Sequence, residues 1–537
     1  MATEHGTATT DDASGTESGS YPVGLTLLSG AVAAASVLPL YWLAETAFRS
    51  GVAEPLSLLV EPASVQILVN SVVLVACVTG ASILISVPLA YLTVRTDLPG
   101  RRFWTVAVML PLVIPSYIGA FAFVSVFSPQ GEVQSLLAPL GVESLPGIYG
   151  LRGTVLVLTL YTYPYVYITT RASLKTLDTS LVDAARTLRH TRWEAFRRIV
   201  VPQIRPAVAA GSLLTALYTL SDFGTPQIMR YSVFTRIIYT RWADSAEFAA
   251  TLSLQLLAVT VLILAVESRL RGDDTLHGSG GGGHTASRVR LGRWRWPAVA
   301  APALVVGFAL VVPIGTLCLR LLRGGATGSG VPFELEYVAH SVDVSLAAAL
   351  VATLLGLPVA YLSARHENRL GDLFERVTYV GYAVPGVVMG LALVFVGISV
   401  VPDLYLTLPL LVFAYVVRFL PQSVGSTRAS FLQINPALPE AARTLGRSSV
   451  GAFRAVTLPL AAPGLLGGAA LVFLTTMKEL PATLMLRPQG YKTLVTYIWQ
   501  MQEDGYYGDA AVPALVLVAI SAASIFVIIS QEGYDVK

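Results

Sequence analysis

The chain is poor in charge and has almost no cysteine. Only 13% of its 537 residues are Asp, Glu, Lys or Arg, while 54% are hydrophobic; a soluble domain carries roughly twice that charge. Cys77 and Cys318 are isolated in apolar runs, which supports neither a disulfide framework nor a metal site, so we expect both to pack in the core. This composition argues against a soluble enzyme and against a disulfide-stapled secreted domain.

Motifs that carry chemistry are also missing. The sequence has no G-x-x-x-x-G-K-[ST] phosphate loop, no zinc-ligand spacing and no nucleophile motif with a plausible triad. His277 and His284 flank a glycine run and are interpreted as part of a solvated linker rather than as metal ligands. We therefore expect no catalytic site, no bound cofactor and no metal centre in this chain, and we expect no nucleic acid partner.

Long apolar runs are what the sequence does contain. Segments of about 20 residues, the length that crosses a bilayer, recur from Tyr21 onward. We expect spans near residues 22–44, 66–94, 103–127, 151–170, 206–222, 249–267, 297–319, 341–363, 377–400, 405–426, 464–478 and 511–530. The predicted fold class is an all-α integral membrane protein of about twelve transmembrane helices.

The distribution of basic residues predicts the orientation. They follow the second span, fill the loop after the fourth, and crowd the segment from Arg269 to Arg295, and all three regions fall on one side of a twelve-span arrangement. By the positive-inside rule this side is cytoplasmic, so we expect a multi-pass cell-membrane protein with both termini in the cytoplasm. Arg230, Arg236 and Arg241 fall outside, against the rule; either nearby acidic residues balance them or their segment is partly re-entrant.

Two polar, basic stretches repeat each other. A shift of 257 residues aligns Leu181–Val208 with Leu438–Leu465 without a gap, and both contain Ala-Ala-Arg-Thr-Leu. We call them the first and second islands. Each is expected to form two short helices joined by a turn. In the second island Asn435 is a predicted cap, Pro436 the first helical residue and Gly446 a left-handed terminator.

The repeat extends over both halves of the chain. At a shift of 270 residues the matched pairs include Ser71 and Ser341, Pro88 and Pro358, Arg95 and Arg365, and Pro115 and Pro385. We predict a disordered tail over residues 1–20, a first repeat over 21–270, a flexible Gly/Ser/Arg linker over 271–296 and a second repeat over 297–537. The tail lacks Lys and Arg, so we do not expect the first apolar run to be a cleaved signal. Six spans per half make the repeats parallel, with a pore or cavity between them.

The second island resembles the EAA loop of binding-protein-dependent ABC permeases, through Glu440-Ala441-Ala442, Gly446 and Leu458-Pro459. In that family the loop is a cytoplasmic coupling helix that docks into a groove of an ATPase subunit. The first island has Asp183 for Glu and Arg189 for Gly, so the resemblance implies two unequal docking sites. In the first island Ser180 and Asp183 also have capping-box spacing.

The resemblance implies two copies of the ATPase subunit, one on each island, which would supply the ATP and Mg chemistry. This chain would therefore be a transport subunit and not an enzyme. The docking residues implied are Asp183, Ala184, Ala185, Arg189 and Pro202 in the first island, and Glu440, Ala441, Ala442, Gly446 and Pro459 in the second.

Two acidic residues end apolar spans at equivalent positions, Asp222 and Glu479. A carboxylate at bilayer depth costs about 2.5–3.5 kcal/mol on insertion scales, so each requires water, a partner or a role. A boundary position or pairing with Lys478 or Arg230 is favoured over direct substrate contact, but both residues are candidate pathway residues. Four tyrosines either line a wet path or form an interfacial belt: Tyr161, Tyr163, Tyr165 and Tyr167.

The sequence around these carboxylates resembles iron(III) ABC permeases, in Ser221–Gly224 followed by Met229–Tyr231, and in Lys478–Thr483. The resemblance covers the whole span region and implies an ATP-driven importer subunit, for iron(III), that takes substrate from an external solute-binding protein. Permeases for thiamine, polyamine, phosphonate, or molybdate and sulfate are alternatives within this class. From a different class, a twelve-span secondary transporter also has parallel halves.

Overall fold

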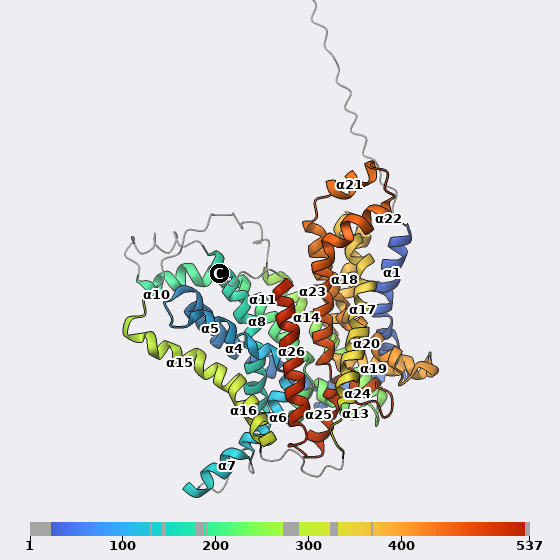
Figure 1. The fold of residues 1–537 in the computed structure, drawn as a ribbon. Coiled ribbons are helices and arrows are strands. Elements are labelled where there is room, and N and C mark those ends of the chain that lie inside the picture. Colours follow the sequence, from blue (N-terminus) through green and yellow to red (C-terminus); the bar gives the residue numbers. More distant parts are fainter. Residues whose placement is uncertain are drawn as a thin grey trace, which may run out of the picture.

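The computed structural model describes residues 23–128, 131–141, 147–177, 187, 191–271, 289–322, 331–366 and 369–531. Over these ranges the chain is helical and forms no strand; a single isolated bridge joins Thr96 and Val289. Figure 1 shows the long helices gathered in one bundle. The all-α prediction is therefore confirmed.

Eight helices of the described chain are long and apolar enough to cross a bilayer, and two bent helix pairs raise the number to ten. The eight are Val23–Ala47 (α1 and α2), Pro62–Arg95 (α4), Trp193–Ser221 (ending in α11), Ala246–Val266 (in α14), Gly292–Leu322 (including α15 and α16), Leu335–Arg365 (α17), Leu408–Gln433 (α20) and Ser449–Met477 (ending in α23). Helices α8 (Leu151–Thr176) and α26 (Ala511–Gln531) occupy the other two expected positions without meeting this test. In α8 the reason is its many Thr and Tyr residues.

The spans expected at 103–127 and 377–400 are each formed by a bent helix pair rather than by one continuous helix. Helices α5 (Arg101–Ala107) and η1 (Leu110–Val113) meet α6 (Ser116–Phe127) at a bend of 93°, and α18 (Arg369–Ala383) meets α19 (Gly386–Ser399) at 102°. The cause is a proline at each break, Pro115 and Pro385, because proline forces the preceding residue into an extended conformation. The carboxyl-terminal arm of each pair, α6 or α19, is buried in the middle of the bundle.

The first helices of the two halves are exchanged. In the first half, α1 (Val23–Val37) packs against α17 and α18, and α2 (Pro39–Ala47) packs against α19, all in the second half. In return α15 (Arg295–Val306) packs against α4, and α16 (Val312–Leu322) packs against α6. Figure 1 shows the blue α1 beside α17 and α18. The two halves are thus interlocked rather than placed side by side.

Short helices close the end of the bundle opposite the islands. They are α12 (Gly224–Ile228) and α13 (Phe234–Arg241) in the first half, and α24 (Pro481–Leu486) and α25 (Leu494–Glu503) in the second. The repeated serines hold them in place, since Ser71 Oγ accepts from Phe234 N at 3.2 Å and Ser341 Oγ accepts from Leu494 N at 2.7 Å. The smaller elements α3 (Ala53–Val60) and α7 (Glu132–Leu137) belong to the first half, and α7 projects from this end in Figure 1.

The expected burial of the two cysteines needs correction. Cys77 and Cys318 are exposed rather than packed in the core, because apolar side chains of a membrane bundle also cover the outer surface that faces lipid. The last part of the predicted linker, from Val289 on, lies within the described residues and is hydrogen-bonded to the first half. Val289 N donates to Arg95 O at 2.9 Å, and Leu291 N donates to the Asp97 side chain at 2.8 Å. The predicted tail 1–20 lies outside the described residues.

Candidate functional site

A cavity of about 230 Å³ lies between the two halves. Its walls come from η1, α6, α8, α11 and α12 of the first half and from α18, α20, α23 and α24 of the second. Both predicted pathway residues, Asp222 and Glu479, line it. Arg418 and Lys478 line it as well, so the described lining contains two carboxylates and two cations. Pairing of the halves thus brings together the residues that the sequence singled out, and adds Arg418, which sequence reasoning missed.

Glu479 is held by an ion pair and by the start of the next helix. Its carboxylate accepts from Arg418 Nη1, a guanidinium that is 13% exposed, and from Ala482 N at 3.3 Å. The carboxylate therefore caps α24 while Arg418 neutralises it. Pairing with Lys478 or Arg230 was one of the predicted alternatives for this carboxylate, but the observed partner is Arg418.

Asp222 caps α12 in the same way without a cation. One carboxylate oxygen accepts from Thr225 N at 2.9 Å and the other from Ser116 Oγ. Tyr218 Oη donates to the same serine at 3.3 Å. The side chains near the Asp222 carboxylate are therefore hydroxyl groups, whereas the Glu479 carboxylate is paired with a guanidinium.

Two exchanged residue pairs explain this difference. Arg418 in α20 corresponds to Tyr161 in α8 at the shift of 257, and Gly386 in α19 corresponds to Ser116 in α6 at the shift of 270. A Cβ atom at Gly386 would overlap Arg418 Nη1 and Glu479 Oε1. Glycine at this position therefore makes room for the ion pair, and the serine in the other half supplies the hydroxyl that replaces it.

Both cations also connect the halves. Arg418 Nη2 donates to Ser221 Oγ at 3.2 Å, and Lys478 Nζ donates to Leu112 O at 3.0 Å. Each donor belongs to the second half and each acceptor to the first. These two hydrogen bonds would have to break if the halves separated at the cavity.

The four tyrosines of α8 divide between two faces. Tyr161 and Tyr165 line the cavity. Tyr163 Oη donates to Val108 O at 2.6 Å, and the Tyr167 hydroxyl lies 2.9 Å from Thr93 Oγ1, both inside the protein. Tyr161 and Tyr165 therefore lie where a path lining would place them, and the choice between a path lining and an interfacial belt stays a prediction.

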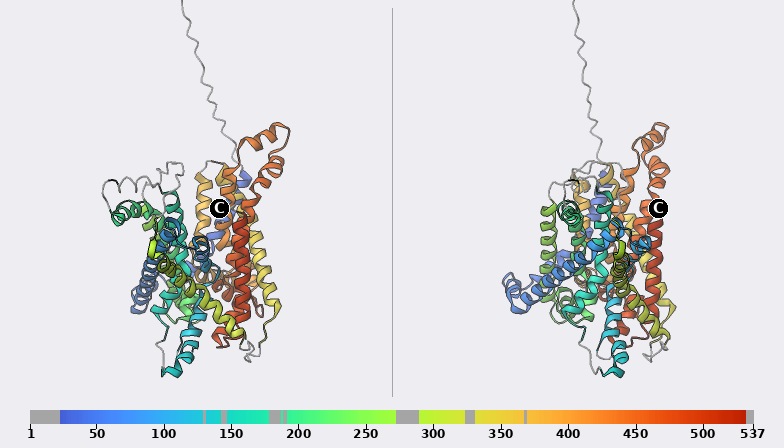
Figure 2. Two further views of the ribbon diagram at one scale, coloured as in Figure 1. Left: turned by 60° about the vertical axis from the view of Figure 1, so that its left-hand side comes forward. Right: turned by 90° about the vertical axis from the view of Figure 1, so that its left-hand side faces the viewer.

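The second island stands out from the bundle as a helical hairpin, α21 (Ala437–Thr444) and α22 (Ser449–Ala452), as Figures 1 and 2 show. The left-handed Gly446 was predicted correctly, whereas Pro436 occupies the N-cap position and α21 begins one residue later, at Ala437. Asn435 Oδ1 accepts from Ala437 N at 3.0 Å, Pro436 has a helical φ of −55°, and Gly446 has a φ of +88°. Leu438 and Leu445 are 48% and 86% exposed, so the hairpin presents apolar side chains that no described residue covers.

The first island is described only in part. Ser180, Asp183, Ala184, Ala185 and Arg189 lie outside the described residues, so their predicted roles stay predictions. At the second short helix, α10 (Arg192–Ala195), Thr191 and Glu194 form a reciprocal capping box: Thr191 N donates to Glu194 Oε2 at 2.8 Å and Glu194 N donates to Thr191 Oγ1 at 3.2 Å. Ser448, the counterpart of Thr191, accepts from Gly451 N at 3.1 Å.

Each island is continuous with a cavity-lining helix. A π-helical turn over Phe196–Val200 leads into α11 (Val201–Ser221), and an equivalent turn over Phe453–Thr457 leads into α23 (Leu458–Met477). These helices end at Asp222 and Lys478 respectively. The repeated arginines fix the other end of each island, since Arg95 Nη2 donates to Leu177 O at 3.1 Å and Arg365 Nη2 donates to Ile434 O at 2.9 Å.

Comparison with known proteins yields a family and several relatives. Residues 68–271 and 352–533 each match the family described as binding-protein-dependent transport system inner membrane component. The chain is 31% identical over 518 residues to a Haemophilus influenzae protein named Fe(3+)-transport system permease protein FbpB 2, covering 94% of this chain and 98% of the relative. It is 24% identical over 485 residues to a ferric transport system permease protein of Actinobacillus pleuropneumoniae, covering 86% and 70%. A probable molybdenum ABC transporter permease protein of Haloferax volcanii is 30% identical over 249 residues, covering 45% of this chain and 88% of that protein.

Proposed function

Because the chain belongs to the family of binding-protein-dependent transport system inner membrane components, we propose that it is the permease subunit of an ATP-driven importer for iron(III), with both permease halves fused. The match of each half to this family rules out the secondary transporter. The relative named for Fe(3+) transport spans nearly the whole chain, which supports iron(III) over the other substrates of the class.

The observation that carries the proposal is the exposed hairpin of α21 and α22. The hairpin packs on the π-helical turn Phe453–Thr457 at its base, and Leu438, Leu445 and Val450 remain exposed. Uncovered apolar side chains on a projecting helix are expected where a partner protein docks. We assign this surface to an ATPase subunit, with Glu440, Ala441, Ala442, Gly446 and Pro459 as docking residues. A second copy of the ATPase subunit would dock at the first island, through Asp183, Ala184, Ala185, Arg189 and Pro202.

A mechanism follows from the continuity of each island with a cavity-lining helix, α11 or α23. Closure of two ATP-loaded ATPase subunits would draw the islands together and tilt α11 and α23, whose far ends adjoin Asp222 and Glu479. The hydrogen bonds of Arg418 and Lys478 across the halves would break and re-form in this movement. Substrate would come from an external binding protein at the end of the bundle opposite the islands, and the islands, with both termini, would lie in the cytoplasm.

Transport by the assembled complex tests the proposal. The chain, the ATPase subunit and the cognate external binding protein are reconstituted in liposomes, and accumulation of radioactive iron(III) is followed with and without ATP. We expect uptake that needs all three components and ATP. Absence of iron uptake by a complex that hydrolyses ATP in response to its binding protein would contradict iron(III) as the substrate while leaving the importer class intact.

A molybdate-type oxyanion is a second candidate substrate. Two observations favour it: the relative named for molybdenum, and the two cations in the cavity, Arg418 and Lys478. The molybdenum relative covers less than half of the chain, so iron(III) is the better supported substrate. Direct binding of iron(III) and of molybdate to the cognate external binding protein decides between them.

A further inference from the structure

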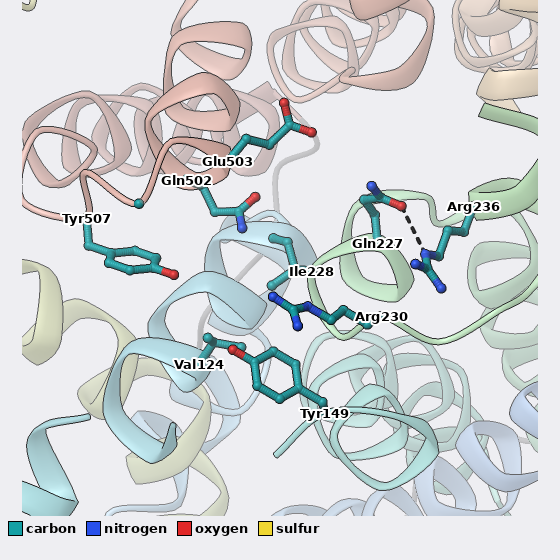
Figure 3. Close-up of a pocket in the computed structure, with 10 residues that line it drawn as sticks. Val124, Tyr149, Gln227, Ile228, Arg230, Arg236, Gln502, Glu503 and Tyr507 are labelled. Carbon is teal, nitrogen blue, oxygen red and sulfur yellow. Dashed lines mark hydrogen bonds between the residues drawn. The ribbon is translucent and has the colours of Figure 1, made fainter. Parts of the chain in front are cut away.

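A second cavity, of about 400 Å³, lies between the halves at the end opposite the islands (Figure 3). We call it the outer cavity. The first half contributes Tyr149, Gln227, Arg230 and Arg236 to its lining, and the second half contributes Gln502, Glu503 and Tyr507. Nothing in the proposed function assigns a role to these residues.

The outer cavity adjoins the central one. Helix α6 supplies Tyr117 to the central cavity and Val124 to the outer one, seven residues apart or about 10 Å along a helix. Phe223, which lines the central cavity, contacts Trp499 with ring centroids 5.2 Å apart, and both residues are 2% exposed. The two cavities are therefore neighbours along the interface between the halves.

The charge of the outer cavity is positive. The Arg230 guanidinium lies 5.0 Å from the Tyr149 ring centroid and has no hydrogen bond or ion pair within the described chain. Arg236 is aimed by Gln227 Oε1 and Ser232 Oγ, each at 3.1 Å. Desolvation and then the charge of Arg230 lower the pKa of Arg236, so the two guanidinium groups are close enough to repel. Glu503 is the one acidic residue among the described residues that line the cavity, and its carboxylate points away from Arg230 in Figure 3.

The backbone at Arg230 is unusual and differs between the halves. Arg230 has a φ of +55°, a left-handed conformation that is unfavourable for a residue with a side chain. It is held by bonds from Arg230 N to Gln227 O at 3.1 Å and from Tyr231 N to Pro226 O at 2.9 Å. Its counterpart Arg487 has an ordinary φ of −63°, and its guanidinium donates to Tyr491 O at 2.9 Å. Arg487 thus stabilises the local backbone of the second half, whereas Arg230 lines a cavity.

We propose that the outer cavity binds a small oxyanion, of the carboxylate or phosphate type, between Arg230 and Arg236. A planar guanidinium presents paired donors that match two oxygens of such a group, and two neighbouring guanidinium groups gain most from an anion that relieves their repulsion. The side-chain amides of Gln227 and Gln502 and the hydroxyl of Tyr507 add neutral donors around the same space. This site goes beyond the proposed function, because it does not depend on which metal is carried.

Calorimetric titration of the full chain in nanodiscs tests the site, with inorganic phosphate and citrate as probes and chloride at matched ionic strength as the blank. We expect the wild type to bind one of the two probes. Arg230→Gln and Arg236→Gln should each weaken binding about tenfold or more, since each removes charged donors. Glu503→Gln should tighten binding or leave it unchanged. Arg241→Gln is the matched control, because Arg241 is exposed at the end of α13 outside the cavity.

Three results would overturn the proposal. One is the absence of heat from the wild type with either probe at about 10 mM. Another is an equal loss in Arg241→Gln, which would indicate nonspecific attraction. The third is loss of binding in Glu503→Gln, which would make the cavity a cation site. If the external binding protein needs Arg230 and Arg236 while neither probe binds, these residues dock protein carboxylates instead. None of these outcomes depends on iron uptake, so failure here is distinguishable from failure of the proposed function.

Discussion

Glu479 and Asp222 occupy equivalent positions, yet within the described chain Glu479 pairs with a guanidinium and the side-chain partner of Asp222 is a hydroxyl group. Both carboxylates cap the short helix that follows, so the backbone role is shared. The difference lies in two exchanges, Arg418 for Tyr161 and Gly386 for Ser116. The repeat has kept its local geometry and lost its charge symmetry, which makes the second half the source of both cations in the central cavity.

The largest effect is expected from breaking the ion pair. Arg418→Met leaves Glu479, which is 7% exposed, without its cation, and an orphaned buried charge costs about 3–5 kcal/mol. We expect a lower midpoint of thermal unfolding for the chain in nanodiscs. Arg418→Met combined with Glu479→Gln should recover part of the loss, because the charge is then gone.

Asp222→Asn is the matched control in the other half. An amide oxygen can still accept from Thr225 N, and no cation is orphaned. A thermal midpoint that falls equally in Asp222→Asn and Arg418→Met would show that the two sites are energetically alike, contrary to the comparison. Uptake per assembled complex, measured in the same variants, tells whether the carboxylates act on substrate or only on stability.

The next largest loss of stability is expected from filling the space beside Gly386. Gly386→Ala places a methyl group against Arg418 and Glu479, and overpacking of this kind costs about 1–3 kcal/mol. Ser116→Ala removes one hydroxyl from Asp222, worth about 1 kcal/mol. Thermal unfolding of the two variants should rank them in that order.

Transplanting the first-half arrangement sharpens this test. Gly386→Ser with Arg418→Tyr reproduces the pair found at Ser116 and Tyr161. It should be more stable than Gly386→Ser alone, because replacing Arg418 removes the larger part of the clash, which the serine makes with both Arg418 and Glu479. A double variant that is no better than the single one would mean that the backbones of the two halves differ at this point.

A smaller effect is expected at the islands, where the comparison is between Glu440 and Asp183. Glu440→Lys should weaken co-purification of the ATPase subunit by about tenfold, and Asp183→Lys should weaken it less, because the second island keeps more of the docking pattern. Asp403→Lys, exposed on another loop, controls for the change in net charge. Equal losses at Glu440 and Asp183, or none, would argue against unequal docking sites.

Much of this architecture was predictable because apolar length and repeated residues are local signals. The shift that aligned the islands also aligned Asp222 with Glu479, and Asn435, Pro436 and Gly446 adopt the conformations that their chemistry favours. Pro115 and Pro385 were recognised as matched prolines, but the bends that they cause were not predicted, because each proline lies within a continuous apolar run.

What the sequence could not supply was the pairing between distant segments. Arg418 lies in the middle of an apolar span, and its equivalent is Tyr161, so the repeat gave no reason to select it. The exchange of first helices is also a tertiary property: α1 and α2 are apolar on several sides, and their composition does not say which half they cover. A buried cation within a span is nevertheless a signal that a search for intramembrane charge would have found.

The smallest effect is expected from cutting the linker inside Gly278–Gly283, provided that both halves are co-expressed. Each half lends its first helices to the other, α1 and α2 to α17, α18 and α19, and α16 to α6, so the pieces hold together without a covalent join. Copurification of the two halves and nearly unchanged uptake are the expected results. Deleting residues 23–52 from the first piece is the control, because it removes α1 and α2 and exposes the side chains of the second half that they cover. If the cut halves are made and inserted but separate on purification, the interlocked helices are not what holds the bundle together; if the deletion has no effect, the exchanged contacts contribute little to association.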